Sequence, residues 1–216
     1  MHTVFIVDDH PLVSQALAQL IDQEPDLTAR GSAGTIRGAL DGIAECRPDC
    51  AIIDISLGDS SGLKLIEDLA QHFPFLNILV LSMHEESLYA ERCLEAGAKG
   101  YIMKKERPEK IITALRRIAS GGVYVSDELG AQLLQRFAGK QHAKDRSRLE
   151  SLSSRELEVF QLIGQGLSPG AIAKQLNLSI KTIETHVGHI RTKMGLKSSR
   201  ELLLHAVHHS MRNTAL

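Results

Sequence analysis

Short runs that are apolar at every position most constrain how this chain can fold. They occur at Val4–Val7, Ala51–Ile53, Ile78–Leu81 and Tyr101–Met103. A strand without polar alternation is covered on both faces, as happens in a parallel sheet that lies between helices. A weaker run, Leu27–Ala33, suits an edge strand. These runs predict a parallel sheet in the first half of the chain.

Apolar residues three and four apart fill several of the gaps between these runs, which is the pattern of one helix face. The stripes are Leu12, Ala16, Leu17, Leu20 and Ile21, then Leu63, Ile66, Leu69, Ala70 and Phe73, then Ile111, Ile112, Leu115, Ile118 and Ala119. Pro11 and Pro108 stand at expected first helical turns, where proline is favoured. Alternating strands and helices predict a doubly wound α/β domain with a five-stranded parallel sheet.

The chain changes character after this first domain. Gly121 and Gly122 stop the last helix of that domain, and a short helix is expected over Asp127–Phe137. The polar stretch at 139–148 has no apolar period, so we expect an interdomain linker there. The expected organisation is a first domain at 1–122, a linker with a short helix at 123–148 and a second domain at 149–216.

Capping signals divide the second domain into four helices. Ser153 and Glu156 form a capping box, Ser168 and Ser179 are N-caps, and Gly195 ends the third helix. The residues expected to point inward are Leu157, Phe160, Ile163 and Gly164, then Ile172, Ala173 and Leu176, then Ile183, Val187, Ile190 and Met194, then Leu202, Leu203, Ala206 and Val207. A tight turn between the second and third helices predicts a helix-turn-helix at about 168–187.

The net charge of −1 conceals an asymmetry between the two halves. Residues 1–122 hold 12 Lys and Arg against 18 Asp and Glu, whereas residues 123–216 hold 13 against 8. A basic second half suggests nucleic acid as its partner. No apolar run approaches the length of a membrane span, and the N-terminus does not resemble a signal peptide. With three cysteines that complete no zinc motif, we expect a cytoplasmic protein with reduced thiols and no membrane partner.

Polar side chains end four of the five expected strands. Asp8 and Asp9 follow the first strand, Asp54 the third, Ser82 the fourth and Lys104 the fifth. In an open parallel sheet, ligands bind outside these carboxyl ends. Carboxylates gathered there repel one another unless a hard cation such as Mg²⁺ joins them, and a lysine supplies a charge for a phosphate. This set predicts phosphoryl transfer to an aspartate.

These motifs resemble the two-component response regulators of the NarL/FixJ subfamily, which join a receiver domain to a LuxR-type helix-turn-helix. The first domain carries the likeness in Val7–Pro11, Asp54–Leu57, Gly62, Leu81–Ser82 and Gly97–Lys104. The second carries it in Leu152–Val159, Gln165–Ser168, Ile172–Leu176 and Ser179–Val187. The resemblance covers nearly the whole chain. It implies a flavodoxin-like strand order 2-1-3-4-5 and a histidine kinase as phosphate donor.

The resemblance also assigns roles to the polar residues of the first domain. Asp54 matches the phosphoacceptor, and Asp9 and Asp54 match direct Mg²⁺ ligands. Asp8 acts through water or as a second ligand, and the Ser56 backbone carbonyl completes the protein contacts of the metal. The remaining matches are Ser82 as the switch hydroxyl, Lys104 as the phosphate-pairing lysine and Tyr101 as the switch aromatic. The family often has proline at the position of Gly58. This difference bears on the rates of phosphorylation and dephosphorylation, not on the site itself.

The third helix of the second domain is the expected recognition helix. By resemblance, bases would be read from Glu184, Thr185 and Gly188, although some relatives have lysine at the first and last of these positions. Lys181, Thr182 and Lys193 are expected to contact phosphates. The helix pattern alone fits a solvated bundle equally well, and His186 could pack, bind a phosphate or read a base. Dimerisation on double-stranded DNA is the usual outcome in this subfamily.

Two other classes of protein fit parts of this pattern. An aspartyl-phosphate hydrolase of similar fold would carry D-x-D with a general acid in the second position, but Ser56 stands there. A protein-binding adaptor would not need the basic balance of the second domain. The sequence therefore favours a transcription factor over an enzyme.

Overall fold

The computed structural model describes residues 1–57, 60–84, 86–131, 149 and 151–214. The chain folds as two compact units, Met1–Gly139 and Lys140–Leu216, and each is described here by itself. Within the described residues, none of the helices is long and apolar enough to cross a membrane.

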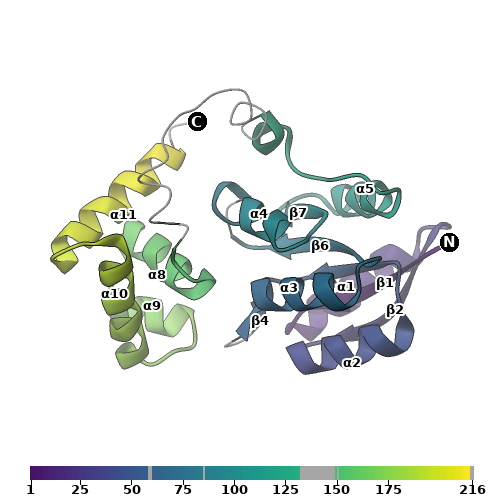
Figure 1. Ribbon diagram of the computed structural model, residues 1–216, viewed down its shortest axis with the longest axis horizontal. Coiled ribbons are helices and arrows are strands. Elements are labelled where there is room, and N and C mark those ends of the chain that lie inside the picture. Colours follow the sequence, from purple (N-terminus) through teal and green to yellow (C-terminus); the bar gives the residue numbers. More distant parts are fainter. Residues whose placement is uncertain (58–59, 85, 132–148, 150, 215–216) are drawn as a thin grey trace. The chain divides into compact units, whose positions relative to one another are not determined.

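The first unit contains the predicted five-stranded parallel sheet. Its strands are β1 (His2–Val7), β2 (Leu27–Ala33), β3 (Cys50–Ile53), β6 (Asn77–Ser82) and β7 (Gly100–Met103). They lie in the order β2-β1-β3-β6-β7, and every neighbouring pair is parallel. Counted within this sheet alone, the order is the expected 2-1-3-4-5. Figure 1 labels β1, β2, β6 and β7 of this sheet.

A small antiparallel ribbon, which the sequence did not indicate, follows β3. It pairs β4 (Ser56–Leu57) with β5 (Ser60–Ser61). Gly62 directly follows the ribbon, and a larger residue would clash there. A Cβ at this position would lie 2.6 Å from the Ile55 Cα and 2.7 Å from the Asp54 carbonyl oxygen. Backbone atoms cannot move aside as a flexible side chain could, so glycine is needed here to hold the loop behind Asp54. Gly58 lies outside the described residues.

Five of the helices in the described part of this unit cover the sheet. They are α1 (Pro11–Asp22), α2 (Ile36–Cys46), α3 (Gly62–His72), α4 (Glu86–Glu95) and α5 (Pro108–Ala119). The stripes named above predicted α1, α3 and α5, whereas no stripe was named for α2 or α4. Pro11 and Pro108 do occupy first turns.

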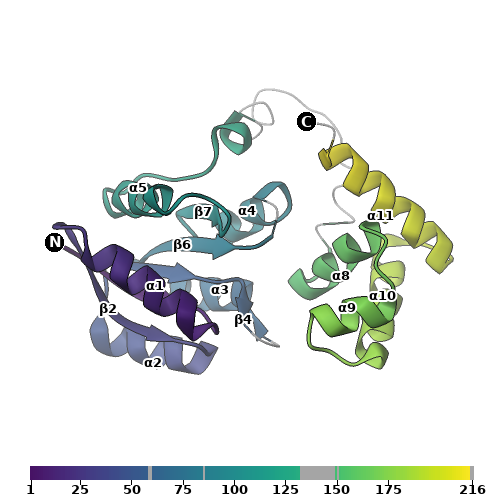
Figure 2. The same ribbon diagram turned by 180° about the vertical axis from the view of Figure 1, so that it is seen from behind.

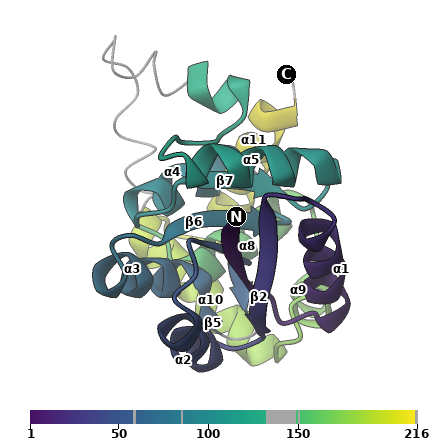
Figure 3. The ribbon, with the colours of Figure 1, turned by 90° about the vertical axis from the view of Figure 1, so that its right-hand side faces the viewer.

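The alternation of side chains along β1 explains why its residues are apolar throughout. Val4 and Ile6 join a core with Leu17 of α1 and Leu115 of α5. Phe5 points to the opposite face, where its ring leaves no room for a Cβ at Gly42 of α2. Figure 3 shows α1 and α5 on one side of the sheet and α2 and α3 on the other. Both faces of the strand are therefore buried.

Leu12 and Ala16 were expected in the buried stripe of α1, and both expectations are wrong. The buried residues of α1 are Ser14, Leu17 and Ile21, while Leu12 is 81% exposed and Ala16 is exposed as well. Positions 14, 17 and 21 form one line along the helix, and positions 12 and 16 lie away from it.

The first unit continues past Gly122. Tyr124 forms an isolated parallel bridge with Gly100, and its backbone accepts a hydrogen bond from the Tyr101 amide. The Ser126 amide donates to the Glu86 carboxylate, and Leu129 is buried. Residues 127–131 are helical, and the rest of the helix expected at Asp127–Phe137, like the stretch at 139–148, lies outside the described residues. The segment at 123–131 therefore packs as part of the first unit.

In its described residues, the second unit contains the expected four helices, α8 (Ser154–Gly164), α9 (Pro169–Gln175), α10 (Ile180–Met194) and α11 (Ser199–Thr214) (Figure 2). The capping box of Ser153 and Glu156 is present. Gly164 lets α11 approach α8, because a Cβ there would lie 2.6 Å from the Ala206 carbonyl oxygen.

One inward residue of α11 was predicted wrongly. Leu202 and Ala206 are buried, as expected, but Leu203 is 43% exposed. Positions 202 and 206 are one turn apart on the same helix face, whereas position 203 lies about 100° around the helix axis from 202.

Candidate phosphoacceptor site and DNA-binding surface

The predicted acidic residues meet at the carboxyl edge of the sheet. Asp8 and Asp9 follow β1, and Asp54 follows β3, the neighbouring strand. Ligand atoms of these three residues and of His10 all lie within 4.8 Å of one another. Asp8 and Asp54 are buried, at 4% and 3% exposure, and Asp9 is partly exposed. The sequence therefore located the cluster correctly, apart from His10.

Lys104 bridges the two buried carboxylates. Its Nζ donates to Asp8 Oδ2 at 2.6 Å and to Asp54 Oδ2 at 2.7 Å. Burial by itself would lower the pKa of Lys104, but the hydrogen bonds to Asp54 and Asp8 outweigh it and hold the pKa above its usual value. The ammonium group is thus charged at neutral pH and lies beside the oxygen atoms of Asp54.

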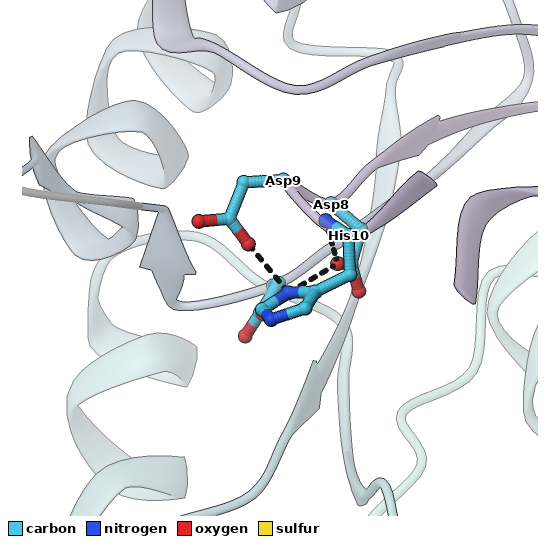
Figure 4. A group of neighbouring side chains, drawn as sticks. Asp8, Asp9 and His10 are labelled. Atoms are coloured by element: carbon cyan, nitrogen blue, oxygen red, sulfur yellow. Dashed lines mark hydrogen bonds and ion pairs between the residues drawn. The ribbon is translucent and has the colours of Figure 1, made fainter. Parts of the chain in front are cut away.

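His10 is the residue of this cluster to which the sequence analysis assigned no role. Its Nδ1 lies 2.7 Å from Asp9 Oδ1 and 3.3 Å from Asp8 Oδ1. Figure 4 shows the imidazole turned toward both carboxylates. The sequence does place a histidine directly after two aspartates at a strand end. That position matches a family motif, but by itself it indicates no role for the side chain.

A hydrogen-bonded chain leads from the Asp54 loop to the residues expected to act as a switch. The Ser56 amide donates to Asp54 Oδ1 at 3.0 Å, and Ser56 Oγ is hydrogen-bonded to His84 Nε2 at 2.9 Å. The His84 amide donates to Ser82 Oγ, and the His84 carbonyl accepts a hydrogen bond from the Tyr101 hydroxyl at 2.9 Å. His84 was not predicted, because its position in a loop carries no periodic signal.

Tyr101 points into the first unit rather than to solvent. Its side chain is 1% exposed, and Ser82 is fully buried. Burial raises the pKa of Tyr101, so its hydroxyl keeps its proton and donates to His84. The ring of His84 stacks on Tyr89 of α4, with 4.5 Å between centroids. Ser82, Tyr101 and α4 are therefore joined through a single histidine.

In the second unit, α10 buries one face and exposes another. Ile183, Ile190 and Met194 are buried as predicted, and Val187 is half-buried. The predicted contact residues on the other face are exposed, except for the partly buried Thr182: Lys181, Glu184, Thr185, Gly188 and Lys193. The Thr182 hydroxyl is hydrogen-bonded to Ser179 Oγ at the start of the helix. The turn between α9 and α10 places Asn177 at a φ of 53°.

Lys193 is engaged within the unit. Its Nζ donates to Glu156 Oε2 at 2.6 Å, which ties the end of α10 to the start of α8. Burial alone would raise the pKa of Glu156, but the bonds from Lys193 and from the Ser153 amide outweigh it, so this pKa lies below its usual value. Among the predicted phosphate contacts, Lys193 therefore has a structural partner that a phosphate would have to replace.

His186 lies between the two faces of α10. Burial lowers its pKa, so the imidazole is mainly neutral at pH 7. Its Nδ1 is buried with no hydrogen-bond partner among the described residues. Its partial burial favours packing within the unit, one of the alternatives left open by the sequence.

A doubly wound sheet with this acidic edge, followed by a helix-turn-helix unit, is the architecture of a regulator that joins a receiver domain to a DNA-binding domain. Residues 4–116 match the response regulator receiver domain, and residues 150–206 match the bacterial regulatory proteins of the luxR family. The chain belongs to this family of response regulators, and it is a phosphorylation-dependent regulator of transcription.

Several known proteins are similar along nearly the whole chain. The oxygen regulatory protein NreC of Staphylococcus haemolyticus is 34% identical over 208 residues, which cover 94% of this chain and 96% of that protein. RcsB from Salmonella enterica serovar Typhimurium, solved bound to a promoter in the presence of the phosphomimetic BeF3-, is 27% identical with a TM-score of 0.61. That match covers 95% of this chain and 98% of RcsB.

Proposed function

We propose that this chain accepts a phosphoryl group on Asp54 from a histidine kinase and then binds a specific double-stranded DNA site as a homodimer. The observation that carries the first step is the approach of Lys104 Nζ to Asp54 Oδ2, at 2.7 Å within a buried acidic cluster. A cation so close to one aspartate oxygen would neutralise charge on a phosphoryl group that arrives there.

The donor set of the cluster fits Mg²⁺, a hard cation that prefers carboxylate oxygens. Asp9 and Asp54 would hold the ion together with the Ser56 carbonyl, and Asp8 would contribute through water or directly. When bound, the ion supplies charge neutralisation for phosphoryl transfer. Asp54 would be the nucleophile: one carboxylate oxygen would bond to phosphorus as the phosphorus–nitrogen bond to the histidine of the kinase breaks, which leaves a mixed anhydride on Asp54 and a free histidine on the kinase. Its neighbours Lys104 and the Ser56 amide orient the two carboxylate oxygens.

The switch would follow from new charge at Asp54. Ser82 Oγ is held by the His84 amide and would turn toward the phosphoryl oxygens, as a hydroxyl donor does toward an anion. The His84 loop would then move with Ser82, and this movement would change the contacts of Tyr101 and Tyr89. Small local changes of this kind bias a surface that has two arrangements.

DNA binding is assigned to the exposed face of α10. Lys181 and Thr182 at its start would contact phosphates, and Lys193 at its end would do so where a phosphate replaces Glu156 as its partner. Glu184, Thr185 and Gly188 would face the bases, where Glu184 could accept from a cytosine N4 group. A homodimer agrees with the paired half-sites that helix-turn-helix proteins read, and RcsB is described as dimers bound to DNA.

The phosphoacceptor is tested with Asp54→Asn in the full chain. Wild type incubated with acetyl phosphate and Mg²⁺ should gain one phosphoryl group by intact-mass spectrometry and bind a selected operator more tightly. Asp54→Asn should do neither. Asp68→Asn is the matched control, because Asp68 is an aspartate on α3 that pairs with Lys64. A phosphoryl adduct of undiminished yield on Asp54→Asn would refute the assignment.

A further inference from the structure

The acidic cluster contains one nitrogen donor that a site built only for Mg²⁺ does not need. His10 is the N-cap residue of α1, yet its side chain makes no capping hydrogen bond. Its backbone amide donates to Asp8 Oδ1 at 2.9 Å, which holds the residue beside the cluster. The imidazole is therefore available for the two carboxylates on which it converges (Figure 4).

The distances suit shared coordination of one ion. Neighbouring ligands of an octahedral ion with bonds of about 2.1 Å lie about 3.0 Å apart. His10 Nδ1 is 2.7 Å from Asp9 Oδ1 and 3.3 Å from Asp8 Oδ1, so the two separations bracket this value. Opposite ligands of such an ion lie about 4.2 Å apart, so the four ligand atoms, which lie within 4.8 Å of one another, would draw together slightly around it.

The position of His10 complements that of the carboxylates. Asp8 and Asp54 are buried beneath the site, whereas the His10 side chain is 69% exposed. The imidazole thus lies on the solvent side of the cluster, where an ion would otherwise carry water.

We propose that His10 is a metal ligand through Nδ1 and that it shifts this site from Mg²⁺ toward first-row transition ions. This inference rests on the proposed metal site at Asp9 and Asp54. Mg²⁺ prefers oxygen ligands and keeps its water, whereas imidazole suits borderline ions, whose affinity rises along the Irving–Williams order. His10 would therefore add affinity for the transition ion while adding little for Mg²⁺.

Mn²⁺ is the probe, because its unpaired electrons report directly on a bound nitrogen. Pulsed electron paramagnetic resonance of the full chain with one equivalent of Mn²⁺ should show coupling to an imidazole ¹⁴N. The coupling should be absent in His10→Asn, a variant that keeps a favoured N-cap residue. It should persist in His72→Asn, the matched control, since His72 ends α3 and is bonded to the Asp68 carbonyl.

Competition titration supplies the second measurement. The ratio of Mn²⁺ to Mg²⁺ affinity should fall about tenfold in His10→Asn and stay unchanged in His72→Asn. Mn²⁺ binding that is lost in Asp9→Asn but shows no ¹⁴N coupling in wild type would overturn the role of His10 and leave the proposed metal site intact. Mn²⁺ binding unaffected by Asp9→Asn, or absent from wild type, would overturn both.

Discussion

Replacing Lys104 by methionine tests how the acidic edge of the sheet is held together. At 2.6 and 2.7 Å, and with an effective dielectric constant of about 20, each contact of Nζ corresponds to roughly 6 kcal/mol of attraction. Much of that attraction offsets the cost of burying the charges. Removing one partner of a buried ion pair typically costs about 3–5 kcal/mol, because the remaining charge is left without compensation. Lys104→Met leaves two such carboxylates, Asp8 and Asp54.

The loss should depend on the metal. In a chelator at pH 7, the first unit of Lys104→Met should unfold with a free energy about 3–5 kcal/mol below that of wild type. Saturating Mg²⁺ should restore most of the loss, because a divalent cation then compensates the same carboxylates. A recovery of about 3 kcal/mol beyond that of wild type corresponds to roughly 100-fold tighter Mg²⁺ binding in the variant.

Differential scanning calorimetry of the full chain measures both quantities, since the Mg²⁺-sensitive transition identifies the first unit. Lys105→Met is the matched control: the neighbouring lysine is exposed, so its loss should change stability little in either buffer. An equal loss for Lys104→Met with and without Mg²⁺ would mean that the lysine contributes packing rather than charge. A loss below about 1 kcal/mol would refute the reasoning altogether.

The remaining predictions concern the second unit. Because the pKa of Glu156 is lower in the folded protein than in the unfolded chain, its carboxylate stabilises the fold above the unfolded pKa. This stabilisation is lost as the pH falls through the pKa of the folded protein. Between pH 5 and pH 3, the thermal midpoint of Glu156→Gln should therefore fall less than that of wild type. Lys181→Ala should lower the slope of log K against log salt by about one unit on operator and scrambled DNA alike, whereas Lys193→Ala should mainly reduce stability, because Glu156 already holds Lys193. Glu184→Ala and Thr185→Ala should reduce sequence preference by about 1–3 kcal/mol at one base pair. Parallel acid dependence of wild type and Glu156→Gln, or an unchanged operator-to-scrambled ratio for Glu184→Ala and Thr185→Ala, would contradict these assignments.

The sequence by itself determined the layered fold and the place of the acidic site. Strands such as Val4–Val7 and Ile78–Leu81 are apolar on both faces, and this pattern is a local consequence of burial between helices. The polar residues that follow such strands must meet at one edge of a parallel sheet, so Asp8, Asp54 and Lys104 could be placed together before any contact was known. The capping box of Ser153 and Glu156 is likewise a local signal.

Only the tertiary structure decided which groups pair across long stretches of chain. Lys193 and Glu156 are 37 residues apart, and His84 meets Ser56 over 28 residues. Tyr124 joins β7 through its backbone, which carries no side-chain signal, and Leu12 and Leu203 are exposed because other residues fill the helix faces. Periodicity records which face of an element is apolar, whereas partner choice depends on distances between elements that are set only when the chain has packed.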